Sequence, residues 1–161
     1  MSEAVERQAA GGDVALLVGR ILLAAIFIPA GYRHLTEVSR FAGYLDTHGV
    51  PASSVVAVVA AAVEFFGALA ILLGLATRYA ALLMALFSLI AAFVGHRYWH
   101  ADGAEYANQY NHFFKDLAIT GGFLLLYAVG PGRWSIDRRG SWGRSDVQGR
   151  PAEAPGQPEP R

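Results

Sequence analysis

Long apolar runs separated by polar connections dominate this chain. Four runs are long enough to cross the hydrocarbon core of a bilayer as helices, and they cover residues 14–32, 54–75, 79–98 and 112–129. The connection after the second run is so short that the helices on either side of it must be antiparallel neighbours. The pattern therefore predicts an all-α membrane protein, built as an antiparallel bundle of four transmembrane helices.

The polar segments divide the chain into three parts. Residues 1–13 are polar and lack the positive region of a cleaved signal peptide, so they are expected to be a short tail before a retained first helix. Residues 14–137 form the membrane domain, with a short interfacial helix expected around Phe41 to Leu45. Residues 138–161 are rich in Pro, Gly, Arg and Glu, a composition typical of a disordered tail.

Composition agrees with a membrane location and excludes several kinds of chemistry. Hydrophobic residues make up 54% of the chain and charged residues only 16%, against about a quarter in an average soluble domain. The formal net charge is zero and there is no basic run, so nucleic acid is not an expected partner. The absence of cysteine excludes disulfides, thiol exchange and cysteine-ligated cofactors. Redox chemistry therefore requires another bound cofactor or a partner protein.

Polar side chains are expected inside the bundle at Arg20, Glu64, His96 and Lys115. An acid at the centre of a membrane helix costs roughly 2.5 to 3.5 kcal/mol on insertion scales, so Glu64 needs a partner. Arg20 lies roughly 7 Å from Glu64 in predicted depth, at about 1.5 Å per residue, and a long arginine side chain can close that gap. We therefore expect an Arg20–Glu64 ion pair, which either fixes helix packing or forms part of a ligand or proton site.

All five histidines fall on one predicted face of the protein, at or near its outer surface. Imidazole binds metals and titrates near neutral pH, so His96, with His100 and His112 on the outer face, is a candidate for a metal, haem or quinone-headgroup site. The alternative is that these histidines lie at the membrane interface without a ligand. The sequence assigns neither a set of metal ligands nor a catalytic residue.

Several motifs in order along the chain resemble those of the DoxX family of small bacterial four-helix membrane proteins. The likeness covers residues 14–137 and is carried by LVGR, PAGYRHL, VEFFGALAILLGLATRYAAL, FFKDLAITGGFLLL and GPGRWSID. The resemblance implies a multi-pass protein of the bacterial inner membrane. It also implies a link to redox assemblies that handle quinones, sulfur compounds or oxidative stress, as in some members of the family.

Together these observations favour a membrane subunit of a redox complex, with redox proteins and the lipid bilayer as partners. Glu64 and Arg20 would hold charge at mid-depth, while His96 and Lys115 bind a quinone headgroup or an anionic substrate near the outer side. An enzymatic role would be at most that of a subunit of an oxidoreductase. The alternatives are a non-catalytic scaffold or small-solute carrier, and a histidine-based metal site. Small-residue stripes also permit a homo-oligomer.

The distribution of arginine predicts that both termini lie in the cytoplasm, because cytoplasmic segments carry an excess of positive residues. The chain has no native cysteine, so a single introduced cysteine reports its own position. An Arg144→Cys variant in intact cells is expected to resist a membrane-impermeant maleimide, whereas an Asp102→Cys variant in the outer connection is expected to react. Labelling at position 144 from outside would contradict this topology.

Overall fold

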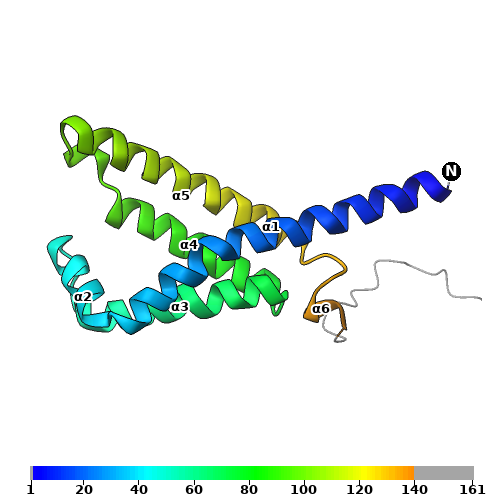
Figure 1. Cartoon of the computed structure of the whole chain (residues 1–161), viewed down its shortest axis with the longest axis horizontal. Helices are drawn as coiled ribbons and strands as arrows, with labels where there is room; N and C mark the ends of the chain where they lie inside the picture. Colours follow the sequence, from blue (N-terminus) through cyan, green and yellow to red (C-terminus); the bar gives the residue numbers. More distant parts are fainter. Residues whose placement is uncertain (1, 140–161) are drawn as a thin grey trace, which may run out of the picture.

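The computed structural model describes residues 2–139, so nearly all of the tail expected at residues 138–161 lies outside the described residues. All elements in this part of the chain are helical: α1 (Ser2–Thr36), α2 (Val38–Thr47), α3 (Ser53–Leu73), α4 (Thr77–Gly95), the short 3-10 helix η1 (Tyr98–His100), α5 (Gly103–Val129) and α6 (Ile136–Arg139). Among the described residues, four segments, in α1, α3, α4 with η1, and α5, are long and apolar enough to cross a membrane (Figure 1). The expected fold class is therefore confirmed.

Two helices extend beyond the apolar runs that predicted them. Helix α1 begins at Ser2 and so includes most of the segment expected to be a polar tail. Helix α5 begins at Gly103, although the sequence pattern placed the start of this span at residue 112. The apolar run marks only the part of a helix that lies in hydrocarbon, and polar residues with good helix propensity continue the same helix into water. The short interfacial helix is present as α2.

The four long helices pack as two pairs. Helix α1 lies along α3 and α4 lies along α5, while α3 and α4 join the pairs and α1 makes little contact with α5 (Figure 1). At the first pair the backbones approach closely, because a Cβ at Gly31 would lie 2.7 Å from the backbone nitrogen of Phe65. A core that includes Phe27, Ile71 and Phe123 fills the centre of the molecule.

At the end of the bundle where α3 meets α4, the Arg20 side chain is buried, with 1% of its surface exposed. Its guanidinium donates to the carbonyl oxygens of Ile71 at 2.8 Å, Pro131 at 2.9 Å and Trp134 at 2.8 Å, and also to that of Leu72. Ile71 and Leu72 belong to the last turn of α3, whose carbonyls lack partners within the helix and carry the negative end of its dipole. Arg20 therefore joins α1, α3 and the segment after α5.

The expected Arg20–Glu64 ion pair is wrong. Glu64 lies about two turns deeper in α3 than the carbonyls that Arg20 reaches. Those carbonyls are at the level of Arg20, and together they offer the guanidinium more acceptors than one carboxylate does. Depth along the helices alone therefore suggested the wrong partner for both residues.

Asp137 completes this end of the bundle from the opposite direction. Its carboxylate accepts from the backbone nitrogens of Ala76, at 2.6 Å, and Thr77, at 2.7 Å, and from the Thr77 hydroxyl at 2.8 Å. It thus caps the positive end of α4, as Arg20 caps the negative end of α3. Gly74 is required between them, since its φ is +66° and a Cβ there would lie 2.5 Å from the Cβ of Ser135. We call the contacts of Arg20 and Asp137 the Arg20 clasp.

Loss of the Arg20 clasp is expected to destabilise the protein. An Arg20→Met substitution removes the guanidinium's hydrogen bonds to four carbonyl groups, so the free energy of unfolding should fall by at least about 3 kcal/mol. Asp137→Ala removes a helix cap and should cost about 1 to 2 kcal/mol. Thermal unfolding in mild detergent measures both, with Arg78→Met, an exposed arginine near the same end, as the matched control. Equal stability of the Arg20 and Arg78 variants would refute this role.

Candidate functional site

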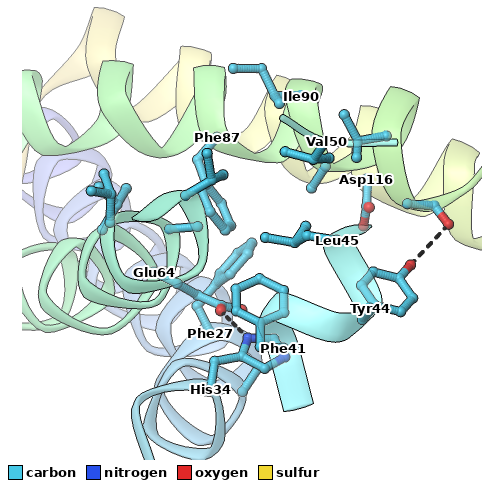
Figure 2. A pocket seen from close by; sticks show the side chains of 18 of the residues that line it. Phe27, His34, Phe41, Tyr44, Leu45, Val50, Glu64, Phe87, Ile90 and Asp116 are labelled. Atoms are coloured by element: carbon cyan, nitrogen blue, oxygen red, sulfur yellow. Dashed lines mark hydrogen bonds and ion pairs between the residues drawn. The ribbon is translucent and has the colours of Figure 1, made fainter. Parts of the chain in front are cut away.

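A cavity of about 950 Å³ lies at the end of the bundle away from the Arg20 clasp. Here the α1–α3 pair and the α4–α5 pair stand further apart than they do near the clasp (Figure 1). Most of the wall is apolar, with Phe27, Phe41, Leu45, Phe87 and Ile90 among its side chains (Figure 2). All four long helices and α2 contribute to the lining. The space therefore lies between the helices of the membrane domain and is partly open at its edge.

Glu64 and His34 form a polar contact on the α1–α3 wall of this cavity. Glu64 is 5% exposed, and its Oε2 lies 2.7 Å from Nδ1 of His34 (Figure 2). The imidazole also stacks on Phe41 of α2, with ring centroids 4.0 Å apart and an interplanar angle of 8°. The partner that Glu64 requires is thus a histidine one helix away, held in place by an aromatic ring.

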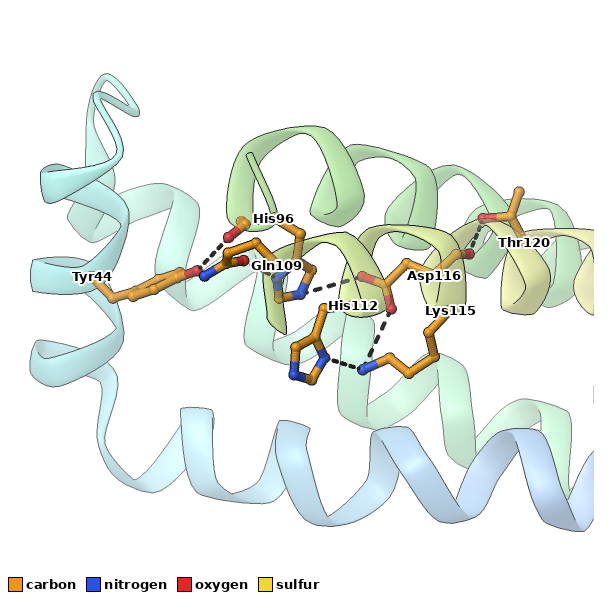
Figure 3. A network of polar contacts seen from close by, with 8 residues as sticks. Tyr44, His96, Gln109, His112, Lys115, Asp116 and Thr120 are labelled. Carbon is orange, nitrogen blue, oxygen red and sulfur yellow. Dashed lines mark hydrogen bonds and ion pairs between the residues drawn. The ribbon is translucent and has the colours of Figure 1, made fainter. Parts of the chain in front are cut away.

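Helix α2 is fastened to the far end of α4. The Tyr44 hydroxyl donates to the carbonyl oxygen of Gly95 at 3.2 Å (Figure 3). The Arg97 guanidinium donates to the carbonyl oxygen of His48. Burial raises the pKa of the Tyr44 phenol, an effect that the nearby Arg97 charge partly opposes. The phenol therefore stays protonated as the donor. These contacts hold α2 across one side of the cavity.

A second polar group lies on the α4–α5 wall, and we call it the His96 cluster: His96, His112, Lys115 and Asp116, which line the cavity, and Gln109, which contacts His96 (Figure 3). Nδ1 of His96 lies 2.9 Å from Oε1 of Gln109, and Nε2 of His96 lies 3.5 Å from Oδ2 of Asp116. The Lys115 ammonium lies 2.7 Å from Nδ1 of His112 and 3.9 Å from Oδ1 of Asp116. The rings of His96 and His112 stack with centroids 4.9 Å apart.

The structure brings together only part of the predicted site. His96, Lys115 and Glu64 line the same cavity, but Arg20 belongs to the clasp. Lys115 is less enclosed than expected, with 47% of its side chain exposed. His112 joins the cavity lining, whereas His100 lies exposed on η1. Within residues 2–139, no group of three potential ligands is placed to hold a metal ion.

Sequence reasoning missed three important residues. His34 was counted only among the histidines of the outer face, although it lies in α1 and pairs with Glu64. Asp116, which the site predicted from the sequence did not include, reaches the His96 cluster together with Lys115. Gln109 fell in a segment expected to be a loop. The charge of Asp116 inside an apolar run was the one signal that pointed toward its role.

These observations describe a multi-pass helical membrane protein with a largely apolar cavity that carries polar side chains on two of its walls. The chain belongs to the DoxX family, whose sequence model matches residues 15–97. It is similar to two inner membrane proteins of Escherichia coli K12: YqjF, 44% identical over 126 residues, and YphA, 35% identical over 130 residues. The matches cover 78% of this chain and 92% of YqjF, and 81% of this chain and 93% of YphA. No solved structure matches the chain significantly.

The family assignment agrees with an inner-membrane location, the location named for both relatives. The matched residues 15–97 include Arg20, His34, Glu64 and His96, and therefore cover the clasp arginine and much of the cavity lining. His112, Lys115 and Asp116 follow this segment in α5. The family assignment thus extends over both ends of the bundle and leaves the chemistry of the cavity open.

A double-mutant cycle is expected to show that Glu64 is coupled to His34 and not to Arg20. His34→Leu and Glu64→Met should show a coupling energy of about 1.5 to 3 kcal/mol, typical of a hydrogen bond to a charged group. Arg20→Met and Glu64→Met share no partner, so their effects should add within about 0.5 kcal/mol. Thermal unfolding in detergent measures both cycles. A larger coupling energy between Arg20 and Glu64 than between His34 and Glu64 would contradict this pairing.

Proposed function

We propose that this protein is the membrane subunit of a redox complex and that it binds the headgroup of a quinone in the cavity. The observation that carries the proposal is an apolar cavity of about 950 Å³ with a polar group on each of two facing helix pairs. Small-molecule sites typically have this volume and are largely apolar, with a few polar groups that orient the ligand.

The lining suits an amphipathic ligand with a flat ring. Phe27, Phe41 and Phe87 offer aromatic surface on which a quinone ring packs. Lys115, His112 and His96 offer hydrogen-bond donors for a carbonyl oxygen at the outer part of the cavity. An apolar tail is compatible with the lipid-facing surface of the same helices, where Leu86 and Ile90 are exposed. In this proposal the quinone ring, its carbonyl groups and its tail each contact side chains of matching polarity.

Reduction of a quinone places protons on its oxygens, so a binding site benefits from side chains that exchange protons near neutral pH. Histidines 34, 96 and 112 line the cavity, and each has a close charged or polar neighbour. In this proposal the electrons come from a redox partner protein, and the chain supplies the binding site and the proton-exchanging groups. The cavity end of the bundle faces the outer side, opposite the cytoplasmic termini.

Substitutions that block or weaken the site are expected to reduce quinone binding. Lys115→Ala removes a charged donor and should weaken binding by about tenfold or more, since such a hydrogen bond contributes about 1.5 to 3 kcal/mol. Glu64→Gln and Ala91→Phe, both in the cavity lining, should also lower quinone reduction in membranes. The matched control is Ala118→Phe, because Ala118 is exposed on the lipid-facing side of α5. Titration of the purified protein with a soluble quinone analogue measures binding directly.

Two outcomes would count against the proposal. Unchanged quinone binding and reduction in Lys115→Ala, Glu64→Gln and Ala91→Phe would mean that the cavity does not hold the ligand. Altered solute uptake in a deletion strain with normal respiration would instead favour a small-solute carrier, in which the His34–Glu64 contact exchanges protons during transport.

A further inference from the structure

The orientation of the Gln109 side-chain amide is fixed by a neighbour on its own helix. Its Nε2 donates to Oε1 of Glu105 at 2.8 Å, one turn earlier in α5. A carboxylate accepts hydrogen bonds and does not donate them, so the amide nitrogen must face Glu105. The amide oxygen then faces the other way, toward His96, whose Nδ1 lies 2.9 Å away. The assignment of nitrogen and oxygen follows from this network.

The orientation of Gln109 determines the tautomer of His96. An amide oxygen accepts a hydrogen bond, so Nδ1 of His96 must carry a proton to make this contact. In a neutral imidazole only one ring nitrogen is protonated, which leaves Nε2 as the nitrogen that gains and loses the second proton. Nε2 is also the nitrogen that lies 3.5 Å from Oδ2 of Asp116. Nε2 of His96 thus lies within ion-pair distance of the carboxylate.

We propose that Gln109, oriented by Glu105, is a positioning residue that locks His96 with its proton on Nδ1, so that Nε2, which lies 3.5 Å from Asp116, is the nitrogen that exchanges a proton at the cavity wall. The role of this tautomer in proton transfer rests on the proposed quinone site, whereas the tautomer itself does not. The charged and titratable neighbours of the pair are Lys115, 3.9 Å from Asp116, and His112, stacked on His96. From α2, the Tyr44 hydroxyl bonds the carbonyl of Gly95, adjacent to His96.

The lock makes proton transfer to a ligand simple. When an oxygen of a quinone reduced by the redox partner takes a proton, the N–H bond at Nε2 breaks and an O–H bond forms. The ring becomes neutral and keeps its proton on Nδ1, where Gln109 holds it. Because no tautomer change is needed, the same nitrogen is ready to accept the next proton from the aqueous side. Without the lock, the neutral ring also adopts the tautomer with Nε2 protonated toward Asp116.

Nitrogen-15 NMR of the full chain in detergent, labelled at histidine and without quinone, tests the lock directly. The ring-nitrogen signals of His96 are identified by their loss in a His96→Gln variant, and spectra are recorded from about pH 5 to about pH 8, where imidazole titrates. In the unmodified protein Nδ1 should stay protonated throughout. Gln109→Leu should convert the neutral ring to a mixture of tautomers, whereas Gln109→Glu, which still accepts a hydrogen bond, should preserve the original form.

A second variant keeps the test decisive if Gln109→Leu does not fold. Glu105→Ala retains Gln109 but frees its amide to rotate, so the His96 signals should move toward the mixture. A neutral His96 protonated on Nε2 in the unmodified protein, or signals unchanged in both Gln109→Leu and Glu105→Ala, would overturn the proposal. Quinone titration is measured separately. A locked tautomer without quinone binding would refute the proposed function alone, and quinone binding with an unlocked ring would refute the positioning role alone.

Discussion

The structure depends on the way Arg20 closes one end of the bundle. A buried guanidinium in a membrane helix is costly unless its donors are satisfied, and here the carbonyls at the end of α3 and in the segment after α5 satisfy them. Asp137 caps the adjacent start of α4 with the opposite charge. One polar cluster therefore joins α1, α3, α4 and the C-terminal segment without requiring close packing between α1 and α5.

Because the clasp holds one end, the other end of the bundle can remain open. The α1–α3 and α4–α5 pairs separate there around a cavity. Glu64 contacts His34, which stacks on Phe41 of α2, and Asp116 contacts His96 and Lys115. Among the described residues, the hydroxyl of Ser88 is the only buried side-chain polar atom without a hydrogen-bond partner. The polar groups of the cavity therefore have partners within the protein.

Sequence reasoning predicted the features that depend on position along the chain and missed those that depend on which helix faces meet. The length of the apolar runs predicted the helical membrane fold, and the charge of Glu64 predicted a buried partner. Arg20 was chosen as that partner from its predicted depth in the membrane. Depth does not show which helix faces meet, so His34 was missed. The first residues of α5 are polar, so the apolar pattern did not predict them as helix and Gln109 was not recognised as a site residue. The DoxX motifs around Arg20 and in GPGRWSID mark two sides of a clasp that only the folded chain brings together.

The most direct test of the central claim, that the cavity holds a quinone, is native mass spectrometry of the protein extracted from its own host in mild detergent. This measurement detects bound small molecules and co-extracted chains together. The account predicts a quinone bound to the unmodified protein and absent from the Ala91→Phe variant. A bare chain, or one that carries only lipid in both forms, would contradict it and would favour a carrier or scaffold.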